Sequence, residues 1–200
     1  MKAKYLIKLV ILGTIIDSFS LGTEKSFSKI DETPIIQKIT PDLEKIILQG
    51  QPKIETKENI NSYINETYKN LQIPDHITKK FIKKVINAES DKYINAISPI
   101  GARGLMQLTQ VAWNQVEKED YYTHSFNPQL NIEVGIKYLL HLDKYLENNY
   151  PGWNSLPANE KRRLMSAAYN GGIGRLEKRK WEIENMPKET QRYVKDVYTN

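Results

Sequence analysis

Cysteine is absent from this chain of 200 residues, and its absence excludes several classes of protein at once. Without cysteine there can be no disulfide framework, no zinc–thiolate site and no thiol nucleophile. A lipoprotein is excluded as well, because there is no thiol to carry the lipid.

Histidine is also scarce, with His76, His124 and His141 far apart in the sequence. No pair has the short spacing of two metal ligands on one helix, so we expect no metal, and we expect no organic cofactor either. The formal net charge of +5 is a mild bias towards anionic partners. Nucleic acid is not an expected partner, because no dense basic stripe with interleaved aromatic residues occurs.

No apolar run reaches the ~20 residues that a membrane-spanning helix needs. Residues 6–16 are mostly apolar, follow the basic start Lys2 and Lys4, and precede the small residues Ser18 and Ser20. This order predicts a secretory signal peptide over residues 1–20, and hence export to the periplasm or cell envelope, with no integral span in the mature chain. An uncleaved anchor is the alternative.

Residues 21–55 have a weak pattern and three prolines, which predicts a mostly irregular tether with a short helix at residues 41–49. From residue 56 onward, apolar residues recur at steps of three and four, which is typical of amphipathic helices. No convincing alternating strand pattern occurs. We therefore predict one all-α domain over residues 56–200, with Asp75 and Asn131 as candidate helix caps.

Residues 89–108, ESDKYINAISPIGARGLMQL, predict a helix end, a tight loop and the start of another helix. Glu89 shares a helical stripe with Ile82, Val85 and Ile86, so its carboxyl is expected to be partly desolvated. Desolvation disfavours the ionised form and raises the pKa, as a general acid near neutral pH requires. A structural glutamate, paired with Arg103 or a lysine at a frayed helix end, is the alternative.

Four ordered blocks of sequence resemble the lytic transglycosylases of the soluble lytic transglycosylase (SLT) family. The first is Glu89-Ser90 followed by the Ser98-Pro99-x-Gly101-Ala102-Arg103-Gly104-Leu105-Met106-Gln107-Leu108 segment. The others are Asn131-Ile132-x-x-Gly135-x-x-Tyr138-Leu139, Ala168-Tyr169-Asn170-x-Gly172 and Glu189-Thr190-x-x-Tyr193-Val194. The chain departs from the family at Tyr93 and Ile94, where Asn-Pro is usual, and at Ile173, where proline is usual.

The resemblance implies a goose-type, lysozyme-like helical fold and a peptidoglycan substrate, cut at the β-1,4 bond between N-acetylmuramic acid and N-acetylglucosamine. It implies that Glu89 is the acid and base of a reaction leaving 1,6-anhydro ends. It also implies a set of residues that bind the sugars, with Glu189 as a supporting carboxylate: Ser98, Gln107, Tyr169, Asn170 and Glu189.

Two other functions remain compatible with the sequence. One is a lysozyme-like hydrolase acting on the same substrate, and the other is a catalytically inactive module that binds the wall. The expected partner in each case is the glycan strand of peptidoglycan. Association with a secretion or flagellar apparatus is a further expectation.

Overall fold

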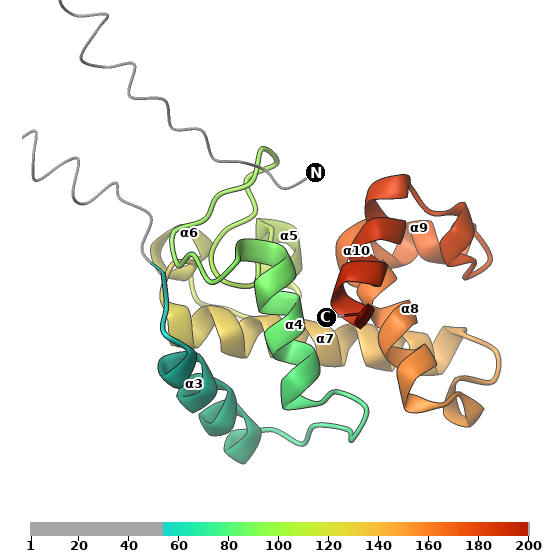
Figure 1. Cartoon of the computed structure of the whole chain (residues 1–200), viewed down its shortest axis with the longest axis horizontal. Helices are drawn as coiled ribbons and strands as arrows, with labels where there is room; N and C mark the ends of the chain where they lie inside the picture. The colour runs from blue at the N-terminus through green and yellow to red at the C-terminus, as the bar shows by residue number, and fades with distance from the viewer. Residues whose placement is uncertain (1–53, 200) are drawn as a thin grey trace, which may run out of the picture. The chain divides into compact units, whose positions relative to one another are not determined.

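The computed structural model describes residues 54–199, which form an all-α domain, as the sequence predicts (Figure 1). Strand-like pairing in this part of the chain is limited to three isolated bridges. The signal peptide and the helix predicted at residues 41–49 lie outside the described residues. The helices are α3 (Lys57–Asn70), α4 (Lys79–Ser90), α5 (Gln110–Asn114), α6 (Tyr121–His124), α7 (Pro128–Asn149), α8 (Ala158–Gly171), α9 (Ile173–Lys178) and α10 (Lys188–Thr199), with short 3-10 turns at Trp153–Ser155 and Ile183–Asn185.

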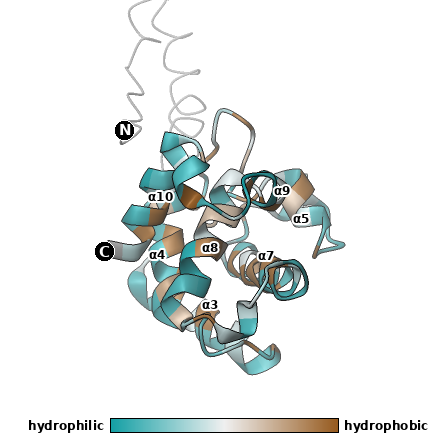
Figure 2. Cartoon of the chain, turned by 90° about the vertical axis from the view of Figure 1, so that its right-hand side faces the viewer, coloured by the Kyte–Doolittle hydropathy of each residue, from teal (hydrophilic) through white to brown (hydrophobic). Residues whose placement is uncertain are grey.

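Helix α7 is the longest helix of the domain, and α3, α5 and α8 pack against it. Figure 1 shows α7 running behind α4, and Figure 2 shows hydrophobic residues on the sides of the helices that face one another. The buried apolar residues of α7 recur at helical spacing. They form the centre of the core, because burying them removes apolar surface from water. They are Ile132, Val134, Ile136, Leu139, Leu142 and Leu146.

Helix α10 packs against both α8 and α4, and this contact brings the last block of the sequence motif to the first. Gly171, at the end of α8, allows the close approach of α10. A Cβ at Gly171 would lie 2.9 Å from two side-chain atoms of Thr190 and would overlap the Met186 methyl group. A larger residue at this position would therefore push α10 away from α8.

Two predicted helix caps are wrong. Helix α4 begins after Thr78, whose hydroxyl accepts a hydrogen bond from the Phe81 amide, and not after Asp75. Helix α7 begins at Pro128 after the cap Asn127, so Asn131 lies inside the helix and is fully buried. Proline at the first helical position fits this start, because the missing amide hydrogen has no partner there in any helix.

The prediction that a helix starts within residues 105–108 is also wrong. Leu105, Met106 and Leu108 are buried in a turn, and helix α5 begins only at Gln110, capped by the Thr109 hydroxyl. Residues 117–126 contain the short helix α6. Asp120 caps α6 by accepting hydrogen bonds from the Thr123 amide and hydroxyl, at 2.8 and 2.7 Å.

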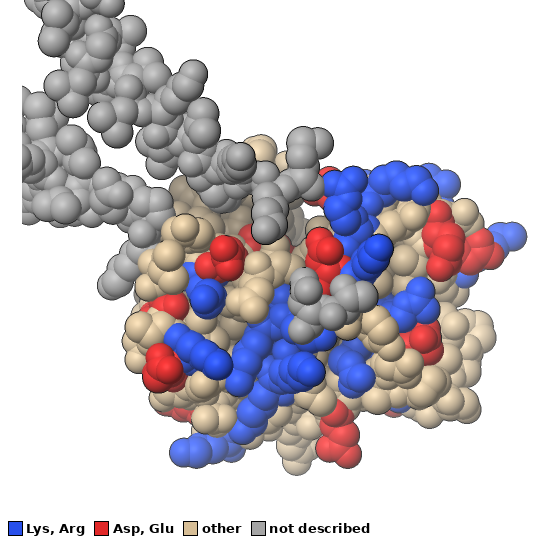
Figure 3. Space-filling view, in the orientation of Figure 1, with Lys and Arg blue, Asp and Glu red and all other residues tan. Residues whose placement is uncertain are grey.

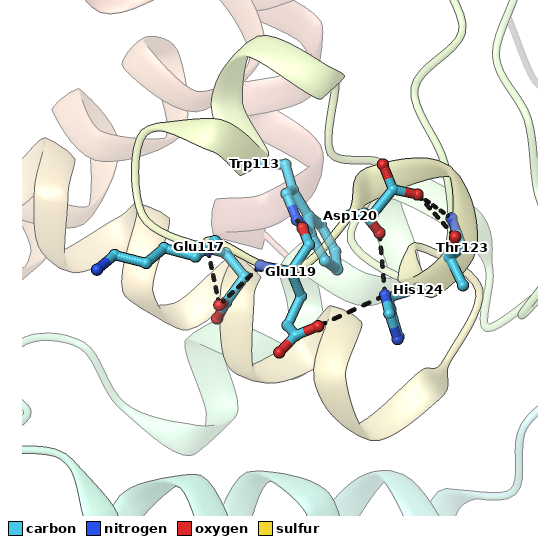
Figure 4. Close-up of polar contacts among 7 residues, drawn as sticks. Trp113, Glu117, Glu119, Asp120, Thr123 and His124 are labelled. Atoms are coloured by element: carbon cyan, nitrogen blue, oxygen red, sulfur yellow. Dashed lines mark hydrogen bonds and ion pairs between the residues drawn. The ribbon is translucent and has the colours of Figure 1, made fainter.

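The turn before α6 is held by local polar contacts, which Figure 4 shows. The Trp113 indole donates to the Glu119 carbonyl at 2.7 Å. The Glu117 carboxylate accepts from two backbone amides that follow it, and the Lys137 ammonium lies 2.9 Å from it. Trp113 is completely buried and packs in the core of the domain.

Candidate functional site around Glu89

Glu89 lies in the last turn of α4, directly beyond the buried stripe formed by Val85 and Ile86. Its side chain is half-buried. Helix α4 ends at Asp91, which adopts a left-handed conformation with a φ of 48° and turns the chain away. Glu89 forms no ion pair within the described residues. The guanidinium of Arg103, its suggested partner, stacks on the rings of Tyr121, Tyr122 and Phe126 instead.

The environment of Glu89 raises the pKa of its carboxyl to about 7. Burial is the largest cause, because removing water destabilises the ionised form. The hydroxyl of Tyr193 acts in the opposite direction and lowers the pKa, whereas the negative charge of Glu189 raises it. Near neutral pH, a large fraction of the Glu89 carboxyl is therefore protonated and able to donate a proton.

Tyr193, which sequence reasoning did not single out, lies on α10 facing Glu89. Its side chain is buried and its hydroxyl has no hydrogen bond of normal geometry, yet it is close enough to influence the Glu89 carboxyl. Burial and Glu89 together raise the pKa of Tyr193 well above its usual value, so the hydroxyl keeps its proton. The sequence could have indicated this role, because Tyr193 follows Glu189 by four residues, about one helical turn, and so lies on the same side of the helix.

Tyr169, in the last turn of α8, is the second tyrosine beside Glu89. Its hydroxyl donates to the Met106 carbonyl at 2.7 Å, and its ring lies edge-on to Tyr138 with centroids 5.5 Å apart. Burial, Glu89 and Tyr138 raise the pKa of Tyr169 well above its usual value. Two neutral phenols thus flank the carboxyl, one from α8 and one from α10.

The turn containing Gln107 is constrained by its own side chain. The Gln107 amide donates to the Ala96 carbonyl at 3.0 Å and to the Gly104 carbonyl at 2.9 Å. Its backbone has a φ of 44°, a left-handed conformation that is uncommon for residues other than glycine and that clusters at functional sites. These contacts fix the backbone beside Met106, where Tyr169 is anchored.

Asn131 fastens the same turn to α7. Its side-chain oxygen accepts a hydrogen bond from the Met106 amide at 2.8 Å. Its side-chain nitrogen donates to the Arg103 carbonyl at 3.1 Å and to the Ser125 carbonyl at 2.7 Å. One buried amide therefore satisfies three backbone groups of two irregular segments, which is why asparagine is needed inside the helix.

The other predicted site residues have different surroundings. The Ser98 hydroxyl accepts from the Ala102 amide at 3.0 Å and closes a turn. Asn170 is exposed near the end of α8, and Glu189 is exposed in the first turn of α10. Glu189 and Tyr169 lie close enough to Glu89 for electrostatic interactions: Glu189 raises the pKa of Glu89, and Glu89 raises the pKa of Tyr169. No hydrogen bond or ion pair of the described residues joins Ser98 or Asn170 to Glu89.

We expect replacement of Tyr193 by phenylalanine to shift the titration of the Glu89 carboxyl to higher pH. The hydroxyl lowers the pKa of Glu89, so its removal raises that pKa further above its ordinary value. The measurement is the titration of this carboxyl, followed by NMR from pH 5 to 9. Tyr198→Phe, an exposed tyrosine of the same helix, is the control. A shift to lower pH in Tyr193→Phe would contradict the assignment.

Within residues 54–199, no group of three or more histidine, aspartate or glutamate side chains is arranged to hold a metal ion. Across the same range, none of the helices combines the length and hydropathy that crossing a bilayer requires.

The amino-acid sequence of this domain matches a known protein family. Residues 63–194 match the family model of the transglycosylase SLT domain. The soluble lytic murein transglycosylase of Escherichia coli strain K12 is 28% identical over 152 residues, which cover 66% of this chain and 21% of that protein. The chain thus matches about a fifth of the length of this relative.

Solved structures share the fold. The 70 kDa soluble lytic transglycosylase of Escherichia coli superposes with a TM-score of 0.52 at 25% identity, over 68% of this chain and 22% of that one. The lytic transglycosylase Slt of Pseudomonas aeruginosa, at 24% identity, matches in fold with the same TM-score, also over 68% of this chain and 22% of its own. With more than half of its residues matched by the family model, the chain belongs to the SLT-domain lytic transglycosylases, enzymes that act on peptidoglycan.

Proposed function

We propose that this chain is itself an active lytic transglycosylase that cleaves the β-1,4 bond between N-acetylmuramic acid and N-acetylglucosamine and leaves 1,6-anhydro ends. The observation that carries the proposal is the half-buried carboxyl of Glu89, whose pKa is raised to about 7. A carboxyl with this pKa can act both as an acid and as a base near neutral pH.

In the proposed reaction, the protonated Glu89 carboxyl donates its proton to the glycosidic oxygen as the bond from that oxygen to C1 breaks. The N-acetyl carbonyl of the same sugar stabilises the positive charge that develops at C1, as in substrate-assisted glycosidases. Glu89, now ionised, accepts the proton of the C6 hydroxyl while the C6 oxygen bonds to C1. No water is consumed, and the carboxyl ends in its original protonated form.

Tyr193 and Tyr169, the two tyrosines beside Glu89, have roles that fit this reaction. The Tyr193 hydroxyl, which has no other partner of normal geometry, can donate to the carboxylate once its proton has left. Tyr169 is anchored on Met106 and presents its ring beside the site. We propose that Tyr169, Gln107 and the exposed Asn170 contact the sugars, with Ser98 near the N-acetyl group and Glu189 as a supporting carboxylate.

Digestion of purified sacculi with the full chain tests the chemistry, with the products identified by mass spectrometry. The proposal expects muropeptides ending in anhydro-muramic acid, lighter than reducing ends by the mass of one water. Glu89→Gln is expected to release almost none, whereas Glu184→Gln, at an exposed carboxylate that pairs with Arg163 and not with Glu89, should match the wild type. Reducing ends alone from the wild-type digest would overturn the transglycosylase assignment.

A hydrolase is the second candidate, and Glu189 is the observation that favours it. A second carboxylate close enough to raise the pKa of Glu89 could activate a water molecule for attack at C1. That function predicts reducing ends and a strong loss of activity in Glu189→Gln. A transglycosylase predicts that Glu189→Gln keeps anhydro products, with an activity profile moved to lower pH, because removing the nearby charge lowers the pKa of Glu89. An inactive wall-binding module predicts no soluble products at all.

We also propose export to the periplasm or cell envelope, because peptidoglycan lies outside the cytoplasm and residues 1–20 have the pattern of a signal peptide. Fractionation of cells that express the full chain provides the check. Recovery of the protein in the cytoplasmic fraction alone would contradict this proposal.

A further inference from the structure

Four lysines of α4 form a basic surface on the helix that carries Glu89; we call it the α4 basic face and define it as Lys79, Lys80, Lys83 and Lys84. Figure 3 shows Lys and Arg side chains gathered at the position that α4 occupies in Figure 1. With a rise of about 1.5 Å per residue, the face extends from about 7 Å to about 15 Å from Glu89 along the helix axis.

The α4 basic face lacks acidic partners within the described residues. Lys79 donates to the Asn65 side chain at 2.7 Å and lies over the Tyr68 ring, and Lys84 donates to the Tyr198 carbonyl at 3.2 Å. Three other basic side chains of the described residues do pair with acids: Lys137 lies 2.9 and 2.8 Å from two glutamates, Lys144 pairs with Glu147 at 2.6 Å, and Arg163 pairs with Glu160 at 2.8 Å.

The positions of these lysines are unfavourable for the helix itself. Lys79 and Lys80 occupy the first turn of α4, where the helix dipole favours acidic residues, and that turn contains no acid. Lys79–Lys83 and Lys80–Lys84 are like-charge pairs four residues apart, which destabilise a helix. A cluster that opposes the stability of its own helix is typical of a surface used for binding.

We propose that the α4 basic face binds the carboxylates of the peptide stems on the glycan strand held at Glu89; this rests on the proposed function. The sugars of such a strand are neutral where stems are attached, so the stems carry its negative charge. The face lies on the solvent side of the helix whose inner side carries Glu89, and a stem of several residues is long enough to reach it, so strands whose stems carry carboxylates gain charge complementarity that strands with neutralised stems lack.

Lys80→Glu is the most informative variant, because we expect it to raise the stability of the domain and to weaken its binding to sacculi. It places an acid in the first turn and converts the Lys80–Lys84 repulsion into a Glu–Lys pair in the favourable order, so we expect Tm to rise by about 2 °C. Binding to sacculi should weaken about threefold at low salt, and about tenfold in Lys80→Glu/Lys83→Glu. A purely structural role for Lys80 predicts a lower Tm instead.

The binding experiment uses the full chain with Glu89→Gln in every sample, so that no strand is cut and catalysis is not needed. Co-sedimentation is measured with intact sacculi and with sacculi whose stem carboxylates have been converted to neutral amides with a carbodiimide and ethanolamine, which leaves the network insoluble. The control is Lys144→Glu, which changes the net charge equally on the exposed surface of α7. We expect the difference between Lys80→Glu and Lys144→Glu on intact sacculi only, and we expect salt to abolish it.

Three results would overturn the inference. They are equal binding by Lys80→Glu and Lys144→Glu, a difference that persists on sacculi with amidated stems, and weaker binding of Lys80→Glu to phosphatidylglycerol vesicles with unchanged binding to sacculi. The last would indicate a membrane surface. Failure of the proposed function is separately visible, because it appears in the products of the wild-type digest and not in sedimentation.

Discussion

Glu89→Gln is expected to lower the rate of glycan cleavage by about 10³-fold or more, because glutamine can neither donate a proton to the glycosidic oxygen nor accept one from the C6 hydroxyl. Glutamine keeps the size and hydrogen-bonding shape of the side chain, so binding of sacculi should persist. Product release is the measurement, with Glu184→Gln as the matched control. A Glu89→Gln variant with wild-type activity would contradict the catalytic role of this residue.

The same substitution should stabilise the domain at pH 8, by about 3 kcal/mol. The pKa of Glu89 is about 7 in the folded chain against an ordinary value of 4.5, so folding at pH 8 places an ionised carboxylate in an unfavourable environment. The stability contributed by the protonated carboxyl is complete below pH 4.5, declines as the pH rises to about 7, and is absent above it. The gain from Glu89→Gln should therefore be present at pH 8 and vanish at pH 4.5.

Denaturant unfolding at the two pH values measures this difference. Glu184→Gln, from an exposed position, should show no such pH-dependent gain. An equal gain of Glu89→Gln at both pH values would indicate a packing effect instead of the removal of a destabilising charge.

Asn131→Ala is expected to destabilise the domain by about 3 kcal/mol, which corresponds to a fall in Tm of about 6–12 °C. Alanine would leave the Met106 amide and the carbonyls of Arg103 and Ser125 without their partner inside the core. Activity should fall as well, because Met106 anchors Tyr169 and is itself held by Asn131. Thermal unfolding and product release are the measurements.

Asn127→Ala is the matched control on the same helix. Asn127 caps α7 from an exposed position by accepting a hydrogen bond from the Leu130 amide at 3.0 Å. Loss of a helix cap destabilises a protein by about 1 kcal/mol, so this variant should unfold at a higher temperature than Asn131→Ala and keep its activity. The reverse order would mean that Asn131 acts as a simple cap after all.

The errors in the predicted helix starts have a common physical cause. Asn127 and Asn131 are both good caps by residue type, and so are Asp75 and Thr78. Local sequence cannot choose between them, because the choice depends on which side chain is needed elsewhere. Asn131 is used by the turn around Met106, which is far from it in sequence, and so it lies within the helix.

The turn at residues 105–108 shows the same limit. Its Leu-Met-Gln-Leu sequence is typical of a helix, but Gly104 and Gly135 let this segment pack closely on α7. A Cβ at Gly104 would overlap Asn131, and one at Gly135 would overlap Met106. Tertiary packing of this closeness overrides the helical propensity of four residues.

The sequence by itself determined the all-α class, the buried faces of the helices and the place of Glu89 at the end of an apolar stripe, because helical periodicity is a local property. Its four motif blocks also led to the SLT family, which the comparisons confirm. Only the tertiary structure decided the surroundings of Glu89. Tyr169 and Tyr193 are on α8 and α10, distant in sequence, and only the packing of these helices places them beside the carboxyl whose raised pKa the apolar stripe predicted.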